Sequence, residues 1–124
     1  MSNINTQALV TLTAQGAATV NSADLPNGEW RGISLAANLT ATGSVTVTVG
    51  IWGKDGASGL YYLVAAFSGI SLSTTNSITA LQLYPGITSS GVAASSLLPA
   101  TYRVQAVITG AGTVTGTIGG SLIQ

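Results

Sequence analysis

The chain has 124 residues, a length that fits one domain with a self-sufficient apolar core. Charged residues make up only 5% of it, against about 25% in an average soluble domain, and the formal net charge is zero. Because Lys and Arg together number three, no basic patch can neutralise a phosphate backbone, so we expect no nucleic-acid partner.

The start of the chain lacks the pattern of a targeting segment. Residues 1–7 carry neither the positive charge nor the apolar stretch of a signal peptide. We expect residues 1–7 to form a flexible amino-terminal arm and residues 8–124 to form one domain. The longest apolar run, Gly59–Leu72, is interrupted by serine and glycine and is shorter than the ~20 residues of a spanning helix, so we expect no membrane partner.

Several segments place apolar residues at every second position, with threonine or other polar residues between them. This alternation is typical of strands with one buried face. In chain order the segments are Val10–Ala14, Ile33–Leu39, Val45–Ile51, Tyr102–Ile108 and Val114–Ile118. No window shows helical spacing, and the 16 glycines argue against long helices.

Turn residues separate these segments. They are Pro26–Gly28, Ala41–Gly43, Lys54–Gly56, Pro85–Gly86 and Gly110–Gly112. Their spacing of about eight to twelve residues favours a sandwich over parallel βαβ units. The sequence therefore predicts an all-β fold, an antiparallel β-sandwich of about eight strands arranged like a jelly roll.

Two segments depart from simple alternation. Leu60–Phe67 is apolar on both faces, so we expect either a loop, the amino-terminal arm or another subunit to cover the second face. Ile87–Leu98 is rich in Ser, Ala and Gly and is long for a connection in a compact domain. Such a connection either binds something or is a mobile loop.

The groups that usually catalyse reactions are missing. The chain has no His and no Cys, which removes the commonest bases, nucleophiles and metal ligands. Among the three carboxylates, Asp24 and Glu29 lie among turn residues, and Asp55 lies in a turn that lacks the alternating carboxylates of a calcium loop. We therefore expect no enzyme activity, no catalytic residue, no cofactor and no metal site.

The contacts that remain are those with other macromolecules. Exposed Trp30, Trp52 or Tyr61 would offer a platform for sugar rings. We expect Arg103 to pair with Asp24, Glu29 or another subunit. The candidate subunit or capsid contacts are Trp30, Arg31, Tyr61, Leu63, Phe67, Leu97, Leu98 and Arg103.

The stretches Val45–Leu63 and Leu98–Gly110, followed by a closing strand of Thr and Gly, resemble small β-sandwich virion proteins of tailed bacteriophages. Among these the chain looks most like the head decoration, or cement, proteins. The resemblance implies a homotrimer that binds the major capsid protein on the outer surface of the virion and stabilises the shell. It implies synthesis in the cytoplasm of a bacterial host, and it supplies no catalytic residue.

Two other functions remain open at this point. A tail, fibre or baseplate component would share the fold and would co-purify with tails instead of heads. A carbohydrate-binding module would present a ring-sized aromatic platform and bind glycans measurably.

Overall fold

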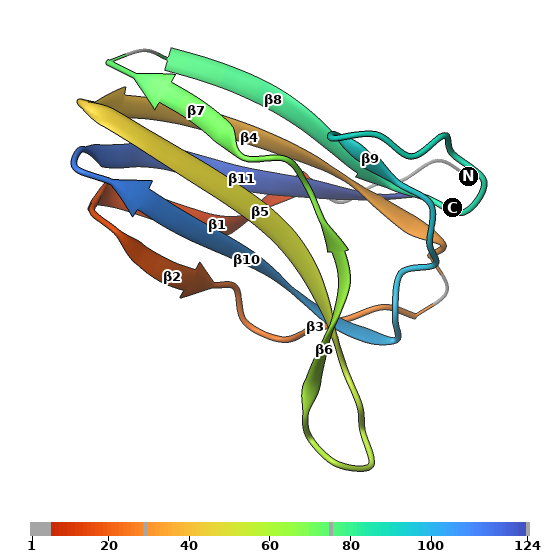
Figure 1. Cartoon of the computed structure of the whole chain (residues 1–124). Helices are drawn as coiled ribbons and strands as arrows, with labels where there is room; N and C mark the ends of the chain where they lie inside the picture. Colours follow the sequence, from red (N-terminus) through yellow and green to blue (C-terminus); the bar gives the residue numbers. More distant parts are fainter. Residues whose placement is uncertain (1–5, 29, 75, 124) are drawn as a thin grey trace.

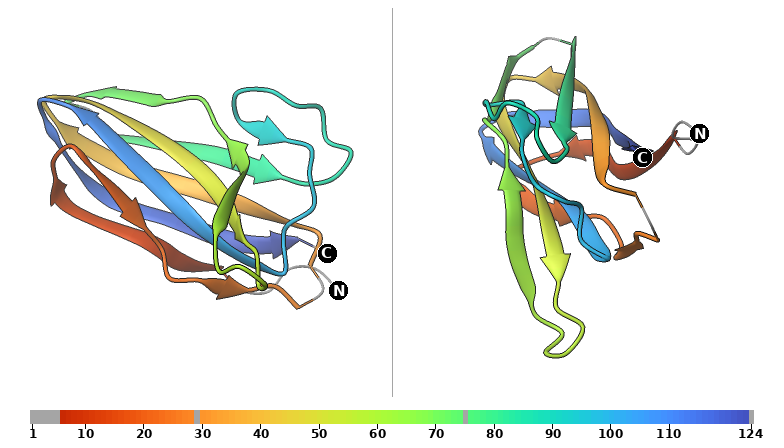
Figure 2. Two further views of the ribbon diagram at one scale, coloured as in Figure 1. Left: turned by 60° about the horizontal axis from the view of Figure 1, so that its bottom comes forward. Right: turned by 90° about the vertical axis from the view of Figure 1, so that its right-hand side faces the viewer.

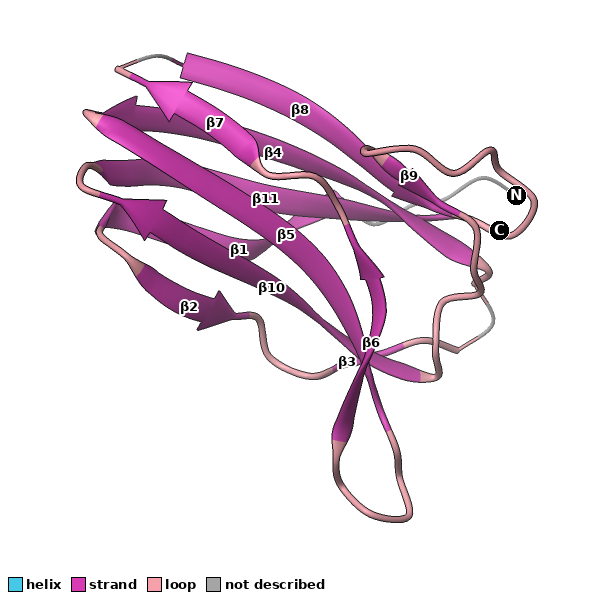
Figure 3. Ribbon diagram, viewed as in Figure 1, coloured by secondary structure: helices cyan, strands magenta, loops and turns pink. Residues whose placement is uncertain are grey.

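The protein is described by a computed structural model that covers residues 6–28, 30–74 and 76–123. Within these ranges the chain forms strands and no helix (Figure 3). The strands are β1 (Thr6–Gln15), β2 (Ala18–Asn21), β3 (Leu25–Pro26), β4 (Gly32–Thr42), β5 (Ser44–Lys54), β6 (Tyr61–Ala66), β7 (Ile70–Ser73), β8 (Asn76–Leu83), β9 (Ala93–Ala94), β10 (Thr101–Gly110) and β11 (Thr113–Ile123). The predicted all-β class is confirmed.

The strands form two sheets that pack face to face (Figure 1). Sheet A has the order β1-β11-β4-β8-β9, and sheet B has the order β2-β10-β5-β6. In sheet B, β3 continues the line of β2 along β10, and β7 continues the line of β6 along β5. All pairs are antiparallel except β8 with the short β9. The predicted β-sandwich is therefore confirmed.

The order of pairing is that of a jelly roll. If β2 with β3 and β6 with β7 each count as one line, and β9 is set aside, the chain supplies eight strand positions. The first then pairs with the last (β1 with β11), the second with the seventh (β2 with β10), the third with the sixth (β4 with β8), and the two central ones with each other (β5 with β6 and β7). This nesting follows from winding one long antiparallel hairpin into two sheets.

Two of the sheet-to-sheet turns lie against each other at one end of the sandwich. Gly43 joins β4 to β5 with φ +83°, and Gly110 ends β10 with φ +112°. The Gly112 N–H donates to the Ser44 carbonyl at 3.1 Å. Positive φ favours glycine because it has no Cβ, which explains the predicted turns at Ala41–Gly43 and Gly110–Gly112.

The core lies between the sheets and follows the alternation. All four apolar positions of the predicted segment Val45–Ile51 are at most 3% exposed. The inward positions of β4 and β10 behave in the same way, and no polar or charged residue is buried among the described residues. Burial of aliphatic side chains therefore holds the sandwich together.

Two residues that were predicted to lie in the amino-terminal arm form part of β1. Strand β1 begins at Thr6 and pairs Thr6 with Ser121 and Gln7 with Gly120. Thr6 and Gln7 therefore belong to the sandwich, and residues 1–5 lie outside the described residues.

A β-bulge explains the doubly apolar segment Leu60–Phe67. Strand β6 pairs Ala65 with Ile51 and Leu63 with Trp52, so Val64 is an extra residue opposite β5. Beyond the bulge Ala65 and Phe67 enter the core, whereas Tyr62 and Leu63 both stay about half exposed. The loop at Ser96–Pro99 borders this segment without covering it.

Candidate functional site

The β5–β6 hairpin projects from the sandwich (Figures 1 and 2). The Asp55 N–H donates to the Leu60 carbonyl and the Gly59 N–H donates to the Asp55 carbonyl, both at 2.8 Å. The Asp55 carboxylate accepts from Ser58 Oγ at 2.7 Å and from the Ala57 N–H at 3.2 Å, and these bonds lower its pKa. The predicted turn at Lys54–Gly56 is confirmed, and Asp55 serves to close it.

Four side chains meet at the base of the hairpin; we call them the Asp24 cluster. Asp24, from the connection between β2 and β3, forms an ion pair with Lys54 of β5 at 3.1 Å and accepts a hydrogen bond from the Tyr61 hydroxyl at 2.8 Å. The Arg103 guanidinium, from β10, lies over the Tyr61 ring at 3.7 Å. Three strands and a connection are thereby joined where the hairpin leaves the sandwich.

The cluster keeps Asp24 charged. The hydrogen bond from Tyr61 and then the one from Lys54 lower the pKa of Asp24 below its ordinary value of 3.8. In return Asp24 raises the pKa of Lys54 above 10.5. Both groups are therefore ionised at neutral pH. Because both side chains are about one third exposed, their ion pair adds little to the stability of the fold.

Arg103 contacts a residue that is not among its predicted partners. Its guanidinium stacks on Tyr61, which itself binds Asp24, and no direct ion pair joins Arg103 to Asp24 within the described residues. Glu29, the other predicted partner, lies outside them.

Large apolar side chains gather on the hairpin and on the loop beside it. Leu60 is 69% exposed, Tyr62 48%, Leu63 52% and Leu97 61%. We call these four the hairpin surface. A groove of about 500 Å³ runs between β6 and the loop Ser96–Pro99, lined by Tyr62, Leu63 and Leu97 among others. Solvent-exposed leucines so close together are unusual on a small domain and are typical of a contact surface.

The loop that carries Leu97 is held in place by hydrogen bonds to Asn27 and Arg31. The Asn27 amide nitrogen donates to the Trp30 carbonyl at 2.8 Å and to the Leu98 carbonyl at 3.0 Å. The Leu98 N–H donates to the Arg31 carbonyl at 2.9 Å, and the Leu98 side chain is buried. Because Leu98 is anchored, its neighbour Leu97 is presented outward in a fixed position.

The predicted contact residues divide into three groups. Tyr61, Leu63 and Arg103 lie together at the base of the hairpin. Trp30, Arg31 and Leu97 lie along the two loops that Asn27 joins. Phe67 and Leu98 are 3% and 5% exposed and belong to the core instead of to a contact surface.

Three exposed or positioning residues were absent from the predicted contact set. Leu60 and Tyr62 belong to the apolar run, and both are exposed because the hairpin projects beyond the sandwich (Figure 1), which the sequence does not show. The sequence predicts Asn27 only as a turn residue. Its hydrogen bond to the Leu98 carbonyl joins residues 71 positions apart in the chain.

The aromatic residues do not form a free platform. Trp30, Trp52 and Tyr61 are each half-buried. The Tyr61 ring carries the Arg103 guanidinium, and Trp52 lies over Gly50 beside Leu63. Trp52 has Arg103 of β10 as its cross-strand neighbour.

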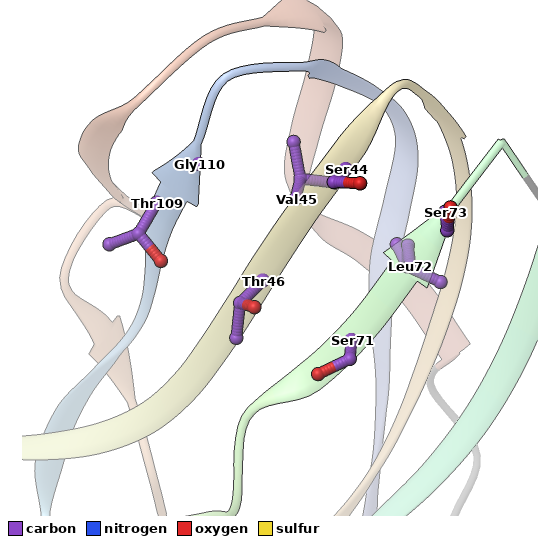
Figure 4. A pocket seen from close by; sticks show the side chains of 8 residues that line it. All are labelled: Ser44, Val45, Thr46, Ser71, Leu72, Ser73, Thr109 and Gly110. Carbon is purple, nitrogen blue, oxygen red and sulfur yellow. The ribbon is translucent and has the colours of Figure 1, made fainter.

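A second hollow lies on the outer face of sheet B (Figure 4). It measures about 390 Å³ and is bordered by β5, β7 and the end of β10. Thr46, Ser71 and Thr109 supply hydroxyl groups, and no charged residue lines it. Hydroxyl groups without a neighbouring base or acid can form hydrogen bonds with a ligand but are not placed for proton transfer.

Two other kinds of site are absent from the described residues. They hold no group of three His, Cys, Asp or Glu side chains placed to bind a metal ion. They also include no helix long and apolar enough to cross a membrane.

Comparison with known proteins gives a weak structural similarity. No family model and no curated protein matches the chain. A chain from the crystal structure of the T13 IBDV viral particle is similar in arrangement, with 13% identity and a TM-score of 0.45. The match covers 98% of this chain and 32% of that chain, so this chain spans about a third of the length of its structural neighbour. A likeness at this level carries no information on function.

Proposed function

We propose that this chain is a non-enzymatic structural protein of a virus particle, which docks onto another protein through the hairpin surface. In its finer form the proposal is a decoration protein that binds the major capsid protein on the outside of the head and stabilises the shell. The observation that carries it is the set of four large apolar side chains exposed on and beside one projecting hairpin.

The hairpin surface is suited to docking because it is already ordered. The Asp24 cluster fixes the base of the hairpin, the bonds of Asp55 close its tip, and Asn27 holds the neighbouring loop. A surface ordered in advance loses little conformational entropy on binding. Its four members carry no charge, so apolar area is buried there without desolvating an ion.

The partner is inferred from the resemblance to phage decoration proteins and from the architecture. Double-sheet jelly rolls are used by capsid proteins and by lectins, so the fold alone leaves the choice open. The near absence of charge favours contact with protein on a shell, where identical weak contacts repeat over a symmetric lattice. A tail, fibre or baseplate location is the alternative within the same class.

Fractionation of the particle tests this proposal. Heads and tails are separated, and the protein is quantified in each fraction with and without the double substitution Leu63→Ser and Leu97→Ser. The proposal expects the protein on heads and a loss of occupancy with the double variant. Recovery on tails would replace decoration by the tail alternative, and recovery on neither would contradict a virion role.

A glycan-binding module is the second candidate, and Trp52 is the observation that favours it. The ring is half-buried on the outer face of sheet B beside Leu63 and the stacked Arg103. A glycan array read with the wild-type protein and with Trp52→Ala tests it. Binding that Trp52→Ala removes would support this candidate, and no binding at millimolar glycan would eliminate it.

A further inference from the structure

Strand β8 forms an open edge of sheet A, at the top of Figure 1. Strand β9 pairs only with Gln82 and Leu83, so Asn76–Leu81 has β4 on one side and no strand on the other within the described residues. The Gln82 N–H points away from β4, since it donates to the Val92 carbonyl at 2.9 Å. Backbone groups on one side of a strand recur at every second residue. Those of Asn76, Ile78 and Ala80 therefore face the open side.

The part of this edge that β9 leaves uncovered lacks the devices that usually protect one. Exposed edges are usually shortened, bulged, charged or interrupted by proline. Strand β8 is eight residues long, its register with β4 is unbroken, and it contains neither a charge nor a proline. At its centre Ile78 is 72% exposed, the largest value among the exposed large apolar side chains.

The other sheet edges do carry such devices. Strand β1 has two register shifts against β11, and Ala14 near its end has φ +44°. Strand β6 has the bulge at Val64, and β2 and β7 are four residues long. The contrast makes the edge of β8 a specific feature and not a general property of the fold.

We propose that the edge of β8 binds the same edge of a second copy of this chain, as an antiparallel pair centred on Ile78. Ile78 then lies opposite Ile78 of the second copy, and Asn76 lies opposite Ala80. The three outward-facing residues of each copy form about six backbone hydrogen bonds in total. The two isoleucines lie side by side on the outer face of the joined sheet, where cross-strand apolar pairs stabilise.

The ends of the free edge match this register. Before Asn76 the chain turns away at Thr74, which has φ +49°, and after Leu81 the edge is taken by β9. Each turn at Thr74 therefore falls where β9 of the other copy begins. No charged residue lies in Asn76–Leu83, so antiparallel pairing places no like charges opposite each other.

The contact has a two-fold axis and closes at two copies. It predicts a dimer in place of the trimer that the resemblance implies. The β8 contact lies apart from the hairpin surface and involves none of its residues, so each proposal can be refuted without the other. Because the pairing buries less than a standard interface, we expect the dimer to dissociate on dilution.

Sedimentation of the full chain over a concentration series tests the pairing. We expect a monomer–dimer equilibrium in which Ile78→Lys weakens association at least tenfold, because it sets two like charges opposite each other. The matched control is Thr11→Lys, which adds the same charge to an exposed position on β1 and should leave the equilibrium unchanged. Mixing Ile78→Lys with Ile78→Glu should restore a dimer that neither variant forms alone.

Cross-linking gives a second readout that does not depend on affinity. The chain has no cysteine, so Ile78→Cys introduces a single thiol, which should link two copies on oxidation, whereas Thr11→Cys should not. A wild-type monomer at millimolar concentration, a trimer, or an association that Ile78→Lys leaves intact would overturn the proposal. Loss of association in Leu63→Ser with retention in Ile78→Lys would place the contact on the hairpin surface instead.

Discussion

Removal of two leucines from the hairpin surface should weaken docking about 30-fold while the fold survives. Full burial of a leucine side chain stabilises by about 1.5–3 kcal/mol. Leu63 is 52% exposed and Leu97 is 61% exposed, so docking can bury roughly half of each, worth about 1 kcal/mol per residue. Leu63→Ser with Leu97→Ser should then lose about 2 kcal/mol of binding, or roughly 30-fold in affinity.

The assay is add-back to particles stripped of this protein, with occupancy measured against the concentration of added protein. The control is Val92→Ser, which removes an apolar side chain that is 47% exposed and lies outside the hairpin surface. We expect the control to change the half-saturating concentration less than about twofold. Equal curves for the wild type and the double variant would refute the reasoning, provided that both are folded by circular dichroism.

Three further predictions follow from the fold and its charges. Gly116→Ala should lower the free energy of unfolding by several kcal/mol, because Gly116 has φ +154° and an added methyl would overlap the Asn38 carbonyl oxygen. The control Gly56→Ala, with open space around it, should change the melting temperature little. Asp24→Asn should lower the melting temperature at pH 7. Since the pKa of Asp24 is lowered below 3.8 in the folded state, this difference should be full above pH 3.8 and should shrink as the pH falls through the lowered pKa. A difference in melting temperature that does not shrink on acidification would contradict the Asp24 cluster. Docking should change little between low and physiological salt, and a steep loss of occupancy with salt would show that charges carry the contact.

The strands that the sequence predicts are those whose alternation agrees with their burial. In β5 and β10 the inward positions are apolar or glycine, and most of the outward ones are polar, so local pattern and tertiary burial coincide. Strand β8 was not predicted because its pattern is reversed over its first half. Ser77 and Thr79 face inward while Ile78 faces outward, and such an inversion becomes visible only when the strand is paired with β4.

The candidate site was predictable in part, for the same reason. That Leu60–Phe67 has more apolar residues than one sheet face needs can be read from the sequence. Which of them stay exposed depends on the bulge at Val64, and the burial of Leu98 depends on Asn27 and Arg31, far away in the chain. The stacking of Arg103 on Tyr61 likewise joins two strands on either side of β5.

Electron microscopy of the particle that carries this protein tests the central claim most directly. The claim predicts jelly-roll density on the outside of the head, with the β5–β6 hairpin and the loop at Leu97 against the capsid surface. Density in which the hairpin points into solvent, while another face contacts the particle, would contradict it.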